Sequence, residues 1–366
     1  MNISKFPNSW ADEFVLETSS IISGVRGNDR SRHVEALKNL DYKLSVLKTF
    51  EPYDKRTVSS FKMKKNYTSS VLAQEDSYIS SIQCLPSGDV LFSTHNKRIA
   101  IYTARGGNKW GEKSSLGTAN AVQGAQIGPN GKISYADNDG GLWTANQPAV
   151  HNNLWVSLPV KKLKNSVSRI QILPDERLAA CTYNGDLAII ETKETGTWME
   201  SILASPGSPL RCMQVLPGNR VVVGDEAGRV RALTRDSEGI WEEVSVAGDG
   251  ARINDLALTD NGKILAVNEA GWILTFDYSP SDGLKVSDCK FIGSTIKCLQ
   301  LLPNNQFLVG TQGGAIRFFR MSESGEIISG DTLDGHRSAV TAMHVFKDGR
   351  IVSGSSDGEI RIWRGV

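Results

Sequence analysis

Large apolar side chains recur along the chain at an almost constant interval. Seven such positions are spaced by 43, 45, 43, 43, 43 and 44 residues, and they are Tyr67, Trp110, Trp155, Trp198, Trp241, Leu284 and Ile328. Nineteen residues after each of them, a second landmark repeats, in most cases a proline followed by a polar or glycine pair such as Ser87-Gly88. Repeats of this length, made of short strands and turns, are typical of a β-propeller in which each repeat is one four-stranded blade. The pattern predicts an all-β fold of seven blades over residues 65–366.

The last repeat shows the elements of one blade directly. Apolar and polar residues alternate in short runs, and the runs are separated by glycine turns of the kind that join the strands of a β-hairpin. In order, the expected elements are an inner strand with Val340, Met343 and Val345, a turn at Lys347-Asp348-Gly349, a strand from Arg350 to Ser355, a hairpin at Asp357-Gly358 and a strand from Glu359 to Trp363.

This repeat resembles a blade of the WD-repeat family, with its Gly335-His336 pair, a small-residue strand, the Asp357-Gly358 turn and a final tryptophan. The resemblance implies a buried hydrogen-bonded chain within the blade, formed by His336, Ser353, Asp357 and Trp363. In the other six repeats, different residue types stand at the histidine and tryptophan positions. We expect those blades to depend on apolar packing instead. A propeller of the NHL type, which has a similar period, is the alternative.

The last repeat contains only three strands before Val366. We expect residues 65–73 to supply its fourth strand, because Tyr67 is in phase with the tryptophans that begin the outer strands of later repeats. Pairing the first segment with the last removes two open sheet edges that would otherwise favour aggregation. The sequence therefore predicts that an N-terminal strand closes the ring.

Residues 1–60 precede the repeats, and their pattern predicts a helical extension with two helices at about 9–25 and 29–50. The second helix carries an apolar stripe at three- and four-residue spacing, formed by Val34, Leu37, Leu40, Leu44 and Leu47. An isolated helical pair of this length is marginal unless its stripe packs on something. Two alternatives stay open: a hairpin packed on the propeller, or a surface for oligomerisation or docking through residues 9–50.

Composition limits the classes of partner. The 41 lysine and arginine residues nearly balance the 40 aspartate and glutamate residues, so no overall charge favours nucleic acid. The sequence has no apolar run of about 18 residues and no apolar signal segment, so we expect no membrane insertion. Cytoplasmic residence is the expectation. The alternative is export without a cleavable signal peptide, as for a bacterial effector that acts in a host cytosol.

Linear motifs for catalysis and metal binding are missing from the sequence. The five histidines are dispersed, without a second histidine or a cysteine at metal-ligand spacing. The sequence contains neither a Gly-x-Ser-x-Gly elbow nor a phosphate-binding Gly-x-x-x-x-Gly-Lys-Ser/Thr loop. We therefore expect no catalytic residue, no metal and no cofactor. Because propellers also host catalysis in their central channel, an enzyme or small-ligand binder is the alternative.

The family resemblance also implies where a partner binds. In WD-repeat proteins the wide end of the ring presents three positions per blade, two beside the first apolar residue of the inner strand and one in the second hairpin. Charged and aromatic residues at these positions predict a partner site at Tyr78, Tyr183, Arg211, Glu226, Arg252, Asn254, Glu269 and Lys297. The alternative is that the charged members form only a solvated salt network between blades.

These observations predict a non-enzymatic scaffold or adaptor. It would bind a protein or peptide of unknown identity on the wide face of a seven-bladed, WD-repeat-like propeller.

Overall fold

The computed structural model of the protein describes residues 67–128, 131–146, 155–173, 177–192, 198–204, 207–216, 220–235, 241–279, 282–322 and 324–365. The helical extension expected over residues 1–60, with helices at 9–25 and 29–50, lies outside these residues. Within the described ranges every element is a strand, and no helix there is long and apolar enough to span a membrane.

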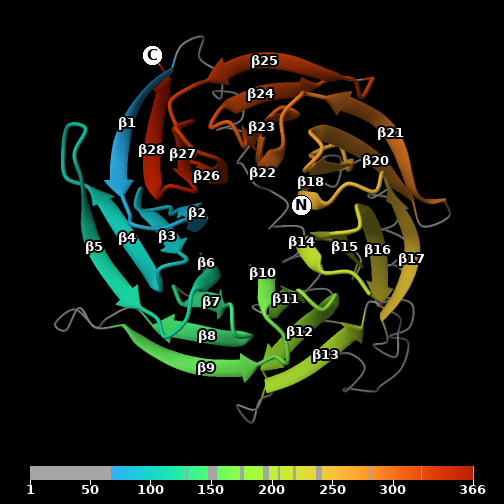
Figure 1. The fold of residues 1–366 in the computed structure, drawn as a ribbon, viewed down its shortest axis with the longest axis horizontal. Coiled ribbons are helices and arrows are strands. Elements are labelled where there is room, and N and C mark those ends of the chain that lie inside the picture. The colour runs from blue at the N-terminus through green and yellow to red at the C-terminus, as the bar shows by residue number, and fades with distance from the viewer. Residues whose placement is uncertain are drawn as a thin grey trace, which may run out of the picture.

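Seven four-stranded antiparallel sheets surround a central channel as the blades of a propeller (Figure 1). The inner strands of blades 1 to 7 are β2 (Ile79–Cys84), β6 (Val122–Ile127), β10 (Val167–Ile172), β14 (Leu210–Leu216), β18 (Ile253–Leu258), β22 (Ile296–Leu302) and β26 (Val340–Val345). The second strands are β3 (Val90–Thr94), β7 (Ile133–Asp137), β11 (Leu178–Thr182), β15 (Arg220–Asp225), β19 (Ile264–Asn268), β23 (Gln306–Thr311) and β27 (Ile351–Ser355).

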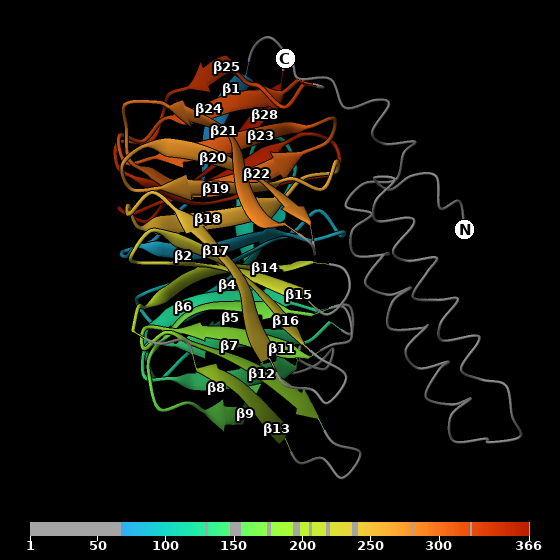
Figure 2. The ribbon, with the colours of Figure 1, turned by 90° about the vertical axis from the view of Figure 1, so that its right-hand side faces the viewer.

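The third strands follow outward as β4 (Arg98–Ala104), β8 (Gly141–Asn146), β12 (Asp186–Thr192), β16 (Arg229–Arg235), β20 (Trp272–Ser279), β24 (Ile316–Met321) and β28 (Glu359–Gly365). The outer strands are β5 (Trp110–Gly117), β9 (Val156–Lys162), β13 (Trp198–Ala204), β17 (Trp241–Gly248), β21 (Gly283–Phe291), β25 (Ile327–Leu333) and, for blade 7, β1 (Tyr67–Gln74). Seen from the side, the blades form a disc with turns at both ends (Figure 2). We call the end at which the inner strands begin the upper end.

Burial follows the position of a strand in its blade. The second strands of blades 1, 3, 5 and 7 are buried along their whole length, because neighbouring blades cover both faces of each sheet. The apolar core is accordingly divided among the blade interfaces; between blades 4 and 5, for example, Cys212 and Val222 pack with Leu256 and Phe276. The seven large residues of the sequence repeat stand at, or one residue from, the start of the outer strands. The prediction of seven blades is confirmed.

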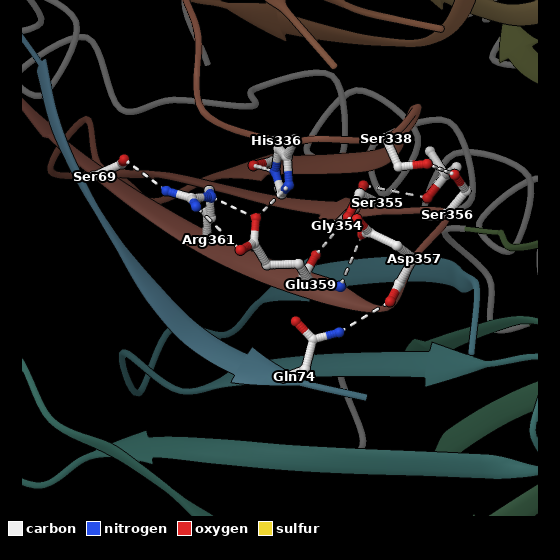
Figure 3. A network of polar contacts seen from close by, with 12 residues as sticks. Ser69, Gln74, His336, Ser338, Gly354, Ser355, Ser356, Asp357, Glu359 and Arg361 are labelled. Carbon is white, nitrogen blue, oxygen red and sulfur yellow. Dashed lines mark hydrogen bonds and ion pairs between the residues drawn. The ribbon is translucent and has the colours of Figure 1, made fainter. Parts of the chain in front are cut away.

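The ring is closed by the N-terminal strand, as predicted. Strand β1 pairs antiparallel with β28, from Tyr67 opposite Gly365 to Gln74 opposite Glu359. The seventh sheet therefore combines segments from the two ends of the described chain, which Figure 1 shows as a blue strand beside a red one. A side-chain bond supports the pairing, because Nε2 of Gln74 donates to the carbonyl oxygen of Asp357 at 2.9 Å (Figure 3).

A buried polar residue ends the second strand of every blade. Each of these residues bonds to the backbone four residues further on, across the hairpin to the third strand; they are Thr94, Asp137, Thr182, Asp225, Asn268, Thr311 and Ser355. The bond fixes the hairpin and satisfies a polar group that would otherwise be costly to bury. Apolar clusters fill the interfaces of the other six blades, as expected, but apolar packing is not their only support. Those blades also carry a buried polar residue at the end of the second strand, which is threonine in blades 1, 3 and 6, aspartate in blades 2 and 4, and asparagine in blade 5.

Candidate functional site

A β-bulge near the upper end of every inner strand sets the candidate site. After the first buried apolar residue of the strand, the register slips by one, and one residue is left without an opposing partner. The seven bulge residues surround the upper opening of the central channel, which we call the channel mouth. They are Ser80, Gln123, Ser168, Arg211, Asn254, Lys297 and Thr341.

Some bulge residues also join neighbouring blades. Nδ2 of Asn254 donates to the carbonyl oxygen of Ile296 at 2.6 Å, and Oγ1 of Thr341 donates to that of Ile79 at 2.7 Å. Ser168 makes the equivalent bond from blade 3 to blade 4. Because each acceptor is the first residue of the next inner strand, these bonds fix the spacing of the blades at the channel mouth.

Arg211 lies between an aromatic and an acidic side chain. The carbon of its guanidinium is 5.1 Å from the centroid of the Tyr183 ring, and its Nη1 is 3.3 Å from Oε1 of Glu226. The two contacts hold the guanidinium in place without enclosing it, since 37% of Tyr183 and 25% of the Arg211 side chain are exposed. Blade 4 therefore presents an ordered cation at the channel mouth, beside the accessible ring of Tyr183.

Arg252, from blade 5, is held in a similar way. Its Nη2 is 3.1 Å from Oε2 of Glu269, and its Nε donates to Oδ1 of Asn254 at 3.1 Å. Lys297 lies nearby on blade 6. Burial lowers the pKa of Lys297, the cations of Arg252 and Arg211 lower it further, and Glu269 raises it. The cationic groups of blades 4 to 6 are thus close enough to repel one another.

Tyr78, from blade 1, also lies at the channel mouth. Its ring stacks on His95, with 4.6 Å between the ring centroids, and the residue is 36% exposed. Burial raises the pKa of its hydroxyl, and the Cys298 thiol raises it too, whereas Arg211 and Arg169 oppose the change. These neighbours belong to blades 3, 4 and 6, so the hydroxyl of Tyr78 interacts with charges of other blades.

The structure thus places the eight predicted partner residues around the channel mouth, and we call them the upper cluster. Their ion pairs run within single blades, from Arg211 to Glu226 in blade 4 and from Arg252 to Glu269 in blade 5. These two pairs therefore do not form the salt network between blades that the sequence left as an alternative.

Below the channel mouth, Arg169 of blade 3 reaches across the channel to Asp255 of blade 5, with 3.1 Å between Nη2 and Oδ1. Asp255 is buried and also accepts the backbone N–H of Leu299 at 3.0 Å, which ties blade 6 to the pair. Solvent in the channel reaches 44% of the Arg169 side chain, although protein surrounds it on all sides. The Asp255 carboxylate raises the pKa of Arg169 against the effect of burial.

Two cavities of about 390 and 210 Å³ adjoin this ion pair, one extending toward each end of the channel. Arg169 and Asp255 were not among the predicted site residues, although the sequence carries a signal for them. The equivalent inner-strand position holds a small residue in the other five blades, namely Ser81, Gly124, Cys212, Cys298 and Ala342. Arg169 and Asp255 differ from these five residues because they are large and carry opposite charges.

The predicted hydrogen-bonded chain of blade 7 differs from the structure at one residue. Ser353 Oγ is 2.6 Å from Nε2 of His336 and accepts from Nε1 of Trp363 at 2.8 Å. Asp357 is exposed and turned away from His336, and its carboxylate accepts from Ser355 and from the backbone N–H of Glu359 (Figure 3). Nδ1 of His336 instead faces Oε1 of Glu359 at 3.1 Å.

A metal centre has no candidate in the described part of the chain, where no group of three or more histidine, cysteine or acidic side chains converges. What the geometry defines is a seven-bladed β-propeller with a polar and aromatic cluster at one opening of its channel.

Comparisons with known proteins narrow this class. Residues 329–364 match the WD40 family (WD domain, G-beta repeat), which favours the WD-repeat interpretation over the NHL type. No curated protein matches the chain in sequence. Among solved structures, it is similar to the crystal structure of the WD40 beta propeller domain of Doa1, with a TM-score of 0.68 and 12% identity over 82% of this chain and 97% of that one. The chain thus has the fold of a seven-bladed WD40-type β-propeller, and its seventh blade matches the WD40 repeat in sequence.

Proposed function

We propose that this protein is a non-enzymatic scaffold that binds a protein or peptide at the upper cluster. WD40 propeller domains generally serve as protein-interaction scaffolds. The observation that carries the proposal is the convergence of aromatic and charged side chains from five blades on the channel mouth. Tyrosine and arginine are frequent interface anchors, because they combine a large contact area with directional hydrogen bonds.

Pre-organisation supports this assignment. Arg211 is fixed by Tyr183 and Glu226, and Arg252 by Glu269 and Asn254, so little side-chain freedom remains to be lost when a partner binds. Both tyrosines keep part of their rings accessible. The cluster therefore suits a partner that lies across the channel mouth and inserts side chains between these groups.

The channel itself is the alternative site, because its larger cavity of about 390 Å³ is lined by ionisable residues that include Arg169, Asp255 and His344. However, Arg169 and Asp255 bind each other. Burial lowers the pKa of His344 to about 4, so its imidazole is neutral at pH 7. Arg169 and Asp255 join blades 3, 5 and 6 to one another, which supports the upper cluster over the channel as the functional site.

The test is a double charge reversal, Arg211→Glu with Arg252→Glu. We expect the variant to lose capture of the physiological partner, as measured by affinity purification and quantitative mass spectrometry. Because both ion pairs are partly exposed, the free energy of unfolding should change by no more than about 1 kcal/mol.

The matched control reverses two cations away from the channel mouth, Arg350→Glu with Lys285→Glu. Arg350 also pairs with a carboxylate, Asp348, and also lies over an aromatic ring, that of Phe346. Lys285 is an exposed ion-paired residue of the outer strand β21. This control should bind the partner as the wild type does. Undiminished capture by the upper-cluster variant would refute the proposed site.

A further inference from the structure

Blades 4 and 6 carry the same polar arrangement except for one charge. Arg211 and Lys297 are the bulge residues of these blades, and the second hairpins hold Glu226 and Gln312 at equivalent positions. The backbone of the two hairpins is bonded in the same way, since the N–H of Glu226 and that of Gln312 each donate at 2.9 Å to the residue before the inner strand. In blade 4 the hairpin carboxylate pairs with the bulge cation at 3.3 Å. In blade 6 a neutral amide stands in its place.

Nothing in the described residues replaces the missing carboxylate. The carboxylate that attracts Lys297, Glu269, is bound by Arg252 at 3.1 Å, and none of the described carboxylates forms an ion pair with Lys297. Lys297 is partly buried, and the charges around it are Arg252 and Arg211, which repel it, and Glu269, which attracts it. A half-buried cation surrounded mainly by cations is unfavourable until an anion approaches it.

We infer that the channel mouth at blades 4 to 6 receives an acidic group of a bound peptide, and that Lys297 is the residue that binds this group beside Arg252. The inference rests on the proposed function, because it assigns one contact within the upper cluster. The chemistry required is a single carboxylate or phosphate. A continuous polyanion fits poorly, since the carboxylates of Glu226 and Glu269, 36% and 46% exposed, lie in the same cluster and would repel it.

The experiment selects peptides from a random heptapeptide library on the immobilised full-length protein. The wild type should enrich peptides with an aspartate or glutamate at a fixed position. Two variants should lose this enrichment by different means: Lys297→Gln removes the cation, and Gln312→Glu gives blade 6 the internal carboxylate that blade 4 already has.

The matched control for Gln312→Glu is Asn138→Asp. Asn138 occupies the same hairpin position in blade 2, and its N–H makes the same backbone bond, to Ala121 at 3.0 Å, but the bulge residue there is the neutral Gln123. A new carboxylate at Asn138 should leave the acidic enrichment unchanged. This control separates neutralisation of Lys297 from a general effect of negative charge at the upper end.

Titration calorimetry on one selected peptide then identifies the acidic group. Replacing its glutamate by glutamine should weaken binding to the wild type about tenfold, and should have little effect on binding to Lys297→Gln. A phosphoserine at this position that binds more tightly than glutamate would assign the site to a phosphorylated partner, within the same inference.

Two results would overturn the inference and are distinguishable from each other. Selected peptides that lack acidic enrichment, yet lose binding with Arg211→Glu and Arg252→Glu, would refute the role of Lys297 and leave the proposed function intact. Selected peptides that bind that double variant as well as the wild type would contradict both.

Discussion

Blades 7 and 4 satisfy their buried polar groups in different ways. In blade 7, which matches the WD40 family, the interior is held by neutral groups, with Ser353 between the ring nitrogens of His336 and Trp363 at 2.6 and 2.8 Å. The aspartate of the repeat, Asp357, takes no part in this chain and is exposed. Three uncharged side chains thus connect the segment before the inner strand with the second and third strands of the blade.

In blade 4 the buried polar groups at the end of the second strand and in the third strand are charged. Asp225 is completely buried and accepts from Nε of Arg229 at 2.8 Å and from Nη2 of Arg231 at 3.0 Å. Arg231, itself 2% exposed, lies 3.3 Å from the Glu243 carboxylate of the outer strand. The comparison shows that a blade requires its buried polar groups to be paired, and that the histidine, serine and tryptophan of the family pattern are one of several side-chain sets that achieve this.

The largest effect on stability should come from removing strand β1, which closes the ring by pairing with β28. Deleting residues 65–73 removes almost all of β1, leaves β28 as an open edge and exposes the apolar surface that Leu72 and Ala73 cover. We expect the cooperative thermal transition to be lost, as followed by circular dichroism and calorimetry. Deleting residues 1–60 instead keeps β1 and should preserve the transition. An unchanged melting temperature after the first deletion would contradict ring closure.

The next largest effect distinguishes the two aspartates. Asp225→Ala leaves the buried guanidinium of Arg231 without its buried carboxylate, and should lower the free energy of unfolding by about 3–5 kcal/mol. Asp357→Ala, the change at the exposed aspartate of blade 7, should cost less than about 1 kcal/mol, because that carboxylate only fixes a turn. Chemical denaturation measures both. Equal losses would mean that Asp357 is as important to its blade as the family pattern implies.

The two blades also explain how far the sequence could be interpreted. The blade count and the ring closure follow from large residues such as Trp198 and Tyr67, because every outer strand starts at or next to one and their spacing is nearly constant. The buried ion pairs of blade 4 could not be predicted from the sequence. Asp225 and Arg231 are six residues apart on either side of a hairpin, and only the register of β15 against β16 brings them together in a buried place.

The candidate site divides in the same way. The place of Arg211 and Lys297 at the channel mouth could be predicted, because the position of the bulge residue relative to the first buried residue of the inner strand is the same in every blade. Arg169 and Asp255 stand out in sequence from the small residues at the equivalent positions, but their contact could not be predicted, since it joins blades 3 and 5 across the channel and depends on the diameter of the closed ring. A repeat pattern determines positions within a blade, but it carries no information about which residues meet across the axis.

A smaller effect should follow when the neutral chain of blade 7 is cut at its centre. Ser353→Ala leaves the indole N–H of Trp363 and the imidazole of His336 without their shared partner, at a cost of about 1–3 kcal/mol of unfolding free energy. The control is Ser356→Ala, which removes only a partly exposed hydroxyl that bonds to Ser338. If both variants unfold at the same denaturant concentration, the buried chain contributes nothing beyond its apolar packing.

The smallest effect is a pH dependence that blade 7 should show and blade 4 should lack, since the interior of blade 4 contains no histidine in the ion pairs described. Burial lowers the pKa of His336 from 6.5 to about 4, although Glu359 partly opposes the change. The unfolded chain therefore binds a proton at a higher pH than the folded one, so stability is fully present above about pH 6.5 and falls as the pH drops toward 4. Between pH 7 and 5.5 this histidine should account for about 1 kcal/mol, and His344, whose pKa burial also lowers to about 4, for a similar loss. In urea titrations at the two pH values, His336→Gln should therefore show about half the wild-type pH dependence, whereas an undiminished dependence would show that the imidazole of His336 is not held neutral by its burial in the blade.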